Sequence, residues 1–211
     1  MSRKAIVGLA ASILLLAAVN LSADPINLLL NPGFETPASG VTPGTPVNLT
    51  GLNNSGGSSA AADWNVWSNG PADMSTVLVP STLPGGGSYM LEVTTTGTNG
   101  GLIQDFLGTP AAAATASVWV WIVSGCVGMG SGDDGDTSVD AQSCTTGSWI
   151  DLSAPSGSTP VTAFLVYDTS AGANFFVDNA AVTPTPEPAT LVLLGSGLLS
   201  LGGFVRRRTR R

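Results

Sequence analysis

Hydrophobic residues follow two different patterns along this chain of 211 residues. Long apolar runs lie near both ends, at 5–19 and 189–205, whereas the residues between them form short apolar stretches separated by Gly, Pro, Ser and Asn. No stretch of this middle part keeps the period of an amphipathic helix, and short Val- and Thr-rich stretches between turn residues are typical of β-strands. The pattern predicts strands at 27–30, 64–67, 75–79, 88–95, 102–106, 115–123, 148–152, 162–167 and 174–182.

Many short strands with turn signals between them predict an all-β sandwich, because each strand needs a facing sheet to bury its apolar side. A turn is expected at Asn31-Pro32-Gly33, after the first strand. Residues 37–62 are rich in Pro, Gly, Asn, Ser and Ala, so we expect them to form a long loop.

The N-terminal apolar run has the features of a cleavable signal peptide. Arg3 and Lys4 precede it, and a small residue, Ala23, follows it just before Asp24-Pro25. A retained membrane anchor is the alternative, but the run is shorter than the roughly 20 residues that a spanning helix needs. We expect residues 1–23 to be removed by signal peptidase after Ala23.

The C-terminal apolar run is long enough to cross a membrane. Residues 189–205 are followed by the Arg cluster 206–211, which would hold this end in the cytoplasm of an exported, tail-anchored precursor. With Pro186-Glu187-Pro188 in front, segment 184–211 resembles the PEP-CTERM sorting signal of Gram-negative bacteria. The resemblance implies recognition by an exosortase, removal of the tail at the inner membrane, and delivery to the cell surface or extracellular matrix. The alternative is a plain anchor after a Pro-rich stem.

Charge divides the chain in the same way as hydrophobicity. Between Ala5 and Val205 there is no Lys, Arg or His, while all 14 acidic residues lie there. A surface without cations cannot neutralise phosphates, which excludes nucleic acid and anionic membranes as partners of residues 24–183. A buried carboxylate in this region must be protonated, hydrogen-bonded to backbone N–H groups or bound to a metal ion, because no basic side chain can pair with it.

The two cysteines, Cys126 and Cys144, both belong to the exported part. In an oxidising compartment we expect them to form a disulfide, which would contribute roughly 3 kcal/mol in the chain-entropy model. Free thiols or a metal site are poorer interpretations, because no His or further Cys is present to complete a site.

Local motifs in residues 24–183 suggest a second resemblance. Six short motifs occur in an order that resembles the galactose-binding-like jelly rolls of many carbohydrate-binding modules. They are segment 27–35, Asp63-Trp64, segment 87–93, Gln104, segment 145–149 and the closing segment 175–179. In that family the matching positions, here Glu35 and Asp178, often hold a structural Ca²⁺, and hard oxygen ligands suit this ion. The alternative is that both carboxylates accept backbone hydrogen bonds at strand ends.

Two further features, an acidic cluster and a pair of tryptophans, can each be interpreted either as a ligand-binding site or as a purely structural feature. Asp133-Asp134-Gly135-Asp136, with Asp140 behind it, is a weak cation site or a solvated turn, since it lacks EF-hand spacing. Trp119 and Trp121 share one face of their strand because side chains alternate. They form either an exposed platform on which sugar rings stack or, if the Val/Ile face is covered by the second sheet, part of the core.

Catalysis has little support in this composition. Without His or Lys there is no general base near neutral pH, and no spacing identifies the carboxylate pair of a glycoside hydrolase. We therefore expect a non-enzyme: an exported surface or matrix protein associated with extracellular polysaccharide. The alternative is a specific carbohydrate-binding module.

Overall fold

The computed structural model describes residues 26–105, 114–132, 139–156 and 161–185, which form one compact unit of β-strands. The expected signal peptide, the sorting motif and the helix expected at 189–205 lie outside these residues, as does the Asp133–Asp136 cluster. Within the described ranges no helix is long and apolar enough to cross a membrane.

Twelve strands form two six-stranded sheets in which all paired strands are antiparallel, so the predicted sandwich is confirmed. The first sheet has the order β1 (Val47–Leu52), β4 (Ala72–Pro80), β5 (Tyr89–Thr95), β12 (Ala173–Pro184), β7 (Ala114–Ser124), β10 (Trp149–Pro155). The second sheet has the order β2 (Ser55–Ser58), β3 (Asn65–Ser68), β6 (Gly100–Asp105), β11 (Ala163–Asp168), β8 (Val127–Gly132), β9 (Ala141–Ser143).

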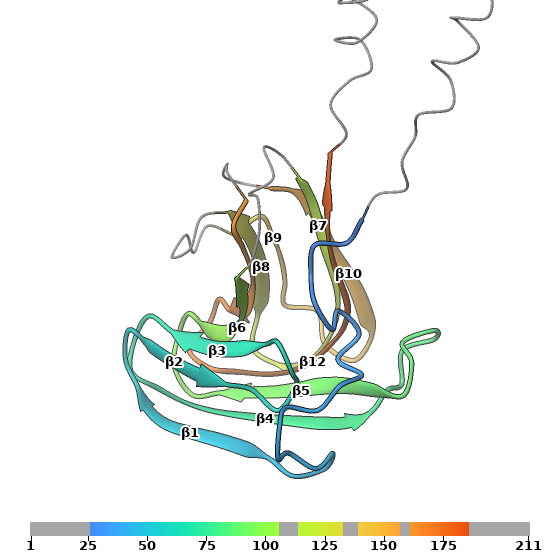
Figure 1. Cartoon of the computed structure of the whole chain (residues 1–211). Helices are drawn as coiled ribbons and strands as arrows, with labels where there is room; N and C mark the ends of the chain where they lie inside the picture. Colours follow the sequence, from blue (N-terminus) through green and yellow to red (C-terminus); the bar gives the residue numbers. More distant parts are fainter. Residues whose placement is uncertain (1–25, 106–113, 133–138, 157–160, 186–211) are drawn as a thin grey trace, which may run out of the picture. The chain divides into compact units, whose positions relative to one another are not determined.

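From β5 onward every connection except the β8–β9 hairpin crosses from one sheet to the other, as in a jelly roll. In Figure 1, β2, β3 and β6 lie above β1, β4 and β5, and β8 and β9 lie beside β7 and β10. Each sheet therefore has one face towards the core and one face towards the outside.

The core lies between the sheets and follows strand alternation. On β7, Val118, Val120 and Ile122 are fully buried, while the residues between them are half-buried. Phe34 and Phe164 pack against Trp64, with ring centroids 4.9 and 6.2 Å from the indole. The second of the two interpretations of β7 is therefore wrong: the Val/Ile face is the core, and Trp119 and Trp121 point outward.

Two sequence-based predictions fail in the first part of the chain. Residues 27–30 form no strand, although the Leu28 N–H donates to the Val182 carbonyl and the Asn27 side chain also bonds to β12. The expected loop at 37–62 contains β1 and β2. Both are edge strands with many exposed residues, so their sequences lack the apolar alternation that marks a half-buried strand.

Strands β8 and β9 were not predicted either. Strand β8 has glycine at every second position, which weakens the sequence signal for a strand. Its place between β11 and β9 nevertheless buries all six residues. The predicted Asn31-Pro32-Gly33 turn is present: the Phe34 N–H donates to the Asn31 carbonyl at 3.1 Å, and Asn31 has a positive φ of 44°.

The predicted disulfide between Cys126 and Cys144 is confirmed. Cys126 lies between β7 and β8, and Cys144 lies between β9 and β10. Both segments are crossovers from one sheet to the other, so the bond joins these two crossovers at the base of the β8–β9 hairpin.

Candidate functional site

The outer face of the second sheet contains a groove of about 480 Å³, which we call the Trp67 groove. Strand alternation creates it, because Val66, Leu102 and Val166 point into the core while their neighbours point outward. The outward apolar residues Ile103, Ala163, Leu165 and Tyr167 form a small cluster against which Trp67 packs. The groove is lined by Gly56, Gly57, Ser58, Asn65, Val66, Trp67, Asn69, Ile103, Asp105 and Leu165.

Glycines form part of this outer face. Gly101 stands in register between Trp67 on β3 and Tyr167 on β11. A Cβ at Gly101 would overlap the Val166 carbonyl oxygen and the Tyr167 backbone, and one at Gly56 would overlap the Val66 carbonyl oxygen. Only glycine therefore fits at these two positions, because the neighbouring strand lies too close for a Cβ.

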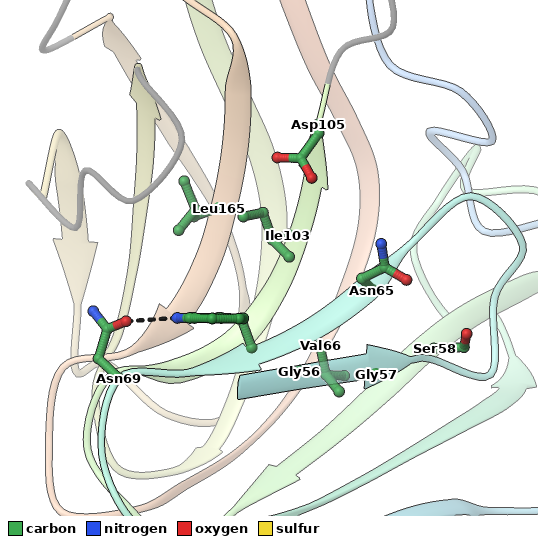
Figure 2. A pocket seen from close by; sticks show the side chains of 10 residues that line it. Gly56, Gly57, Ser58, Asn65, Val66, Asn69, Ile103, Asp105 and Leu165 are labelled. Atoms are coloured by element: carbon green, nitrogen blue, oxygen red, sulfur yellow. Dashed lines mark hydrogen bonds between the residues drawn. The ribbon is translucent and has the colours of Figure 1, made fainter. Parts of the chain in front are cut away.

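The indole of Trp67 is fixed in orientation. Its Nε1–H donates to Asn69 Oδ1 at 2.6 Å, the dashed bond in Figure 2. Trp67 is half-buried, so part of its ring stays accessible from the groove. An indole held this way can stack on a flat apolar surface without losing rotamer freedom on binding.

Polar groups border the apolar centre of the groove. Figure 2 shows Ile103 and Leu165 in its middle, with Asn69 at one end, Asp105 beyond Ile103 along β6, and Asn65 on the neighbouring strand. Asn65 and Asp105 are exposed. A ring, two amides and one carboxylate can bind a neutral molecule with an apolar face and hydroxyl groups. Asp105 is the only carboxylate among the lining residues, so these residues do not include a carboxylate pair of the kind that glycoside hydrolysis uses.

Sequence patterns alone did not predict this groove. Trp67 lies at the end of the strand predicted at 64–67, and no ligand-binding role was predicted for it. The available signal was the alternation of Trp64 and Val66 with Asn65 and Trp67, which puts an indole beside an amide on one face. The other lining residues come from β2, β6 and β11, and only the fold brings these strands together.

Glu35 and Asp178 both lie against the Gly86-Gly87 turn. A Cβ at Gly86 would overlap Asp178 Oδ2, and one at Gly87 would overlap Glu35 Oε1. Glu35 accepts hydrogen bonds from the Ser88 N–H at 2.9 and 3.0 Å and from the Tyr89 N–H at 3.2 Å. The β4–β5 connection therefore contacts both residues of the predicted calcium site, Glu35 and Asp178.

Asp178 is fully buried, and burial raises its pKa to about 6, with the negative charge of Glu35 adding to the shift. Two hydrogen bonds oppose the shift: the Ser81 hydroxyl donates to Oδ2 at 2.6 Å and the Asn179 N–H donates to Oδ1 at 2.8 Å. Two carboxylates and a hydroxyl supply part of the 6–8 oxygen ligands of Ca²⁺. Among the described residues no cluster of three or more acidic, Cys or His side chains could hold a metal ion.

Asp168 is a second fully buried carboxylate, and burial raises its pKa to about 6 as well. It accepts hydrogen bonds from the Thr95 hydroxyl and the Gly100 N–H, both at 3.0 Å. These donors belong to the end of β5 and the start of β6, so Asp168 links the two sheets at the β5–β6 crossover. Asp140, the last residue of the predicted acidic cluster, accepts hydrogen bonds from the Ser131 N–H and hydroxyl, which is a structural use.

Trp119 and Trp121 lie on the outer face of the first sheet, on the side of the sandwich away from the Trp67 groove. Trp119 is paired with Asp178 on β12 and with Asp151 on β10. The structure therefore places the predicted indole platform beside the Glu35–Asp178 pair and apart from the groove.

Residues 184–211 match the model of the PEP-CTERM protein-sorting motif. The chain thus carries this sorting signal, as its terminal pattern predicted. No curated protein sequence matches the chain.

Among solved structures, carbohydrate-binding modules have a similar fold. The CBM22-1–GH10 modules of xylanase Xyn10B from Clostridium thermocellum, complexed with xylohexaose, have 16% identity and a TM-score of 0.45 over 66% of this chain and 28% of that one. The CBM22-1 xylan-binding domain of Paenibacillus barcinonensis Xyn10C has 15% identity and a TM-score of 0.45, over 66% and 95%. The family 11 module from C. thermocellum, bound to a β-1,3-1,4-mixed-linked tetrasaccharide, has 15% identity and a TM-score of 0.41, over 67% and 97%.

Proposed function

We propose that this protein is a non-catalytic carbohydrate-binding protein of the cell surface or extracellular matrix, and that the Trp67 groove binds a neutral polysaccharide chain. The observation that carries the proposal is the indole of Trp67, held by Asn69 beside an apolar floor and bordered by amide and carboxylate groups. A pyranose ring has the matching chemistry: one apolar face for the indole and hydroxyl groups at its rim for the polar side chains.

Charge narrows the ligand class. No Lys, Arg or His occurs between Ala5 and Val205, so nothing in the groove could neutralise a polyanion. We therefore expect neutral polysaccharides, such as the cell's own extracellular glycans, to bind in preference to acidic ones. The alternative is a passive matrix component that binds no glycan.

Binding to a panel of soluble polysaccharides tests the proposal. Xylan, mixed-linked β-glucan and β-1,4-galactan are suitable neutral probes, and alginate is a suitable acidic one. Affinity electrophoresis should show retardation by at least one neutral probe, and Trp67→Ala should weaken binding by about tenfold or more, as for a central aromatic anchor. Trp67→Phe should keep most of the affinity, and Ile26→Ala, at an exposed site outside both sheets, should keep all of it. Absence of binding by the wild type would favour the passive alternative.

Export and processing follow from the terminal signals as a further part of the proposal. We expect signal peptidase to act after Ala23 and an exosortase to remove the tail near Pro186-Glu187-Pro188, releasing the domain from the inner membrane of a Gram-negative cell. Intact mass of the protein recovered from the envelope and medium measures this. A mature species that still contains the Arg cluster 206–211 would contradict the processing.

A structural Ca²⁺ between Glu35 and Asp178 is the third part of the proposal. Two carboxylates without a basic partner, one of them fully buried, favour a divalent cation, and both pack closely against the Gly86-Gly87 turn. The ion would fix the β4–β5 connection against β12.

A further inference from the structure

The outer face of the first sheet carries three aromatic side chains in one line across neighbouring strands. Phe176 on β12 is paired with Trp121 on β7, and Trp121 is paired with Trp149 on β10. The rings of Trp121 and Trp149 are 6.0 Å apart at an interplanar angle of 71°. Because neighbouring strands are about 4.8 Å apart, this aromatic row spans about 10 Å across the strands.

These rings belong to the outside of the domain. Their neighbours along the strands, Val120, Ile122 and Phe175, are fully buried in the core between the sheets. All three rings of the aromatic row, Phe176, Trp121 and Trp149, are only half-buried. Large aromatic side chains are usually buried to a greater extent. An aligned set of such rings on one face is typical of an interaction surface.

Hydrogen-bonding groups border the aromatic row. Glu92 stands in register beyond Phe176, and Asp151 and Ser153 are exposed on β10, the edge strand. Two buried polar atoms lack a hydrogen-bond partner in the described part of the chain, and both belong to residues of this face: Trp149 Nε1 and Asn174 Oδ1. One is a donor and the other an acceptor, so a small rearrangement of this face on contact with a hydroxyl-rich ligand would satisfy both.

The chemistry of this face favours one kind of occupant. A narrow apolar row with carboxylates and hydroxyls at its ends matches a glycan, which combines apolar ring faces with hydroxyl groups. An acidic polymer would meet Glu92 and Asp151 with no basic side chain between Ala5 and Val205 to offset the repulsion. A protein partner with a broad apolar surface would leave these carboxylates buried and unpaired.

We propose that the aromatic row binds a second neutral glycan chain, so that one domain joins two polysaccharide chains through its two outer faces. This inference rests on the proposed function for the first chain, which occupies the Trp67 groove. A single domain then acts as a cross-link in the extracellular matrix, since two sites on opposite faces cannot both hold the same short stretch of polymer.

Turbidity of a soluble mixed-linked β-glucan measures cross-linking, and affinity electrophoresis of the same mixtures measures binding. The protein is the processed form recovered from the producing cells, with its monomeric state established by sedimentation. The Trp121→Ala, Trp149→Ala double variant should lower the turbidity about tenfold while keeping most of the retardation. Trp67→Ala should also lower the turbidity and keep partial retardation. Val77→Ala, on the same outer face but on β4, should change neither.

A second variant separates binding from folding. Trp121→Phe keeps an aromatic ring in the row and should restore turbidity relative to Trp121→Ala, and the near-UV spectra of all variants should retain the signal of the core residue Trp64. The proposal is overturned if the double variant cross-links like the wild type, if Trp67→Ala alone abolishes all retardation, or if the wild type cross-links only because it dimerises through this face. Loss of all retardation in the double variant with full retardation in Trp67→Ala would instead contradict the groove as the glycan site, and would overturn the two-chain proposal with it.

Discussion

The two outer faces of the sandwich belong to different sheets, and both follow strand alternation, but they differ in which residues fill the outward positions. On the second sheet Trp67 is in register with Gly56 on one side and Gly101 on the other, so one fixed indole stands between two positions without a side chain, and the Trp67 groove lies on this face. On the first sheet the outward positions of β12, β7 and β10 carry large aromatic rings side by side, and the result is a row. The size of the side chains at the outward positions therefore decides whether a sheet face forms a groove around a ligand or a flat surface on which a ligand can lie.

Removing the disulfide should have the largest effect, because it acts on both faces at once. Cys126→Ser with Cys144→Ser frees the two crossovers that tie the β8–β9 hairpin to the first sheet. We expect a loss of about 3 kcal/mol in the free energy of unfolding, measured by urea denaturation, and weaker glycan binding at both faces. A change below about 0.5 kcal/mol would show that the hairpin is held by sheet pairing alone.

Adding one methyl group should distinguish the two faces directly. Gly101→Ala places a Cβ against the Val166 carbonyl oxygen and the Tyr167 backbone, and we expect a loss of about 1–3 kcal/mol. Ser117→Thr also adds one methyl group, at an outward and half-buried position of β7, and should stay within about 0.5 kcal/mol. Thermal unfolding of the two variants compares them. Equal costs would contradict the view that only the second sheet depends on absent side chains.

The two buried carboxylates should make the domain less stable at neutral than at mildly acidic pH. Asp168 and Asp178 have folded-state pKa values raised from 3.8 to about 6, so between these values the folded state binds more protons than the unfolded state. The free energy of unfolding therefore falls as pH rises, by about 1 kcal/mol per residue between pH 5 and 7.

Single substitutions show which of the two buried carboxylates causes the decrease in stability with rising pH. Asp168→Asn and Asp178→Asn should each remove about half of the decrease, measured by denaturation at several pH values. Stability that rises between pH 5 and 7 in the wild type would contradict the raised pKa of both groups.

Calcium should have the smallest effect on stability. Of the two buried carboxylates, it should act on Asp178 and not on Asp168. If Ca²⁺ binds between Glu35 and Asp178, it stabilises the ionised form of Asp178 and raises the melting temperature at pH 7 by a few degrees at millimolar concentration. Glu35→Gln and Asp178→Asn should abolish the shift, whereas Asp168→Asn should keep it. A shift of equal size in all three variants, or none in the wild type, would contradict the site.

Several features of the fold and site were predictable because they depend on local sequence. The turn at Asn31 follows from the residue types Asn, Pro and Gly, and the disulfide follows from having two cysteines in an exported domain. The edge strands β1 and β2 and the Gly-rich β8 were not predictable, because their strand conformation comes from hydrogen bonds to neighbours distant in sequence.

The sequence by itself determined the sorting signal at 184–211, the absence of cations from the exported part, and the all-β class, because each is written in residue type and order. Only the tertiary structure decided which side of β7 faces the core, since alternation separates Trp121 from Val120 and Ile122 without saying which set is buried. It also decided that Trp67, Asn69, Asp105 and Leu165 border one groove, because strand order and register bring together residues nearly 100 positions apart in the chain.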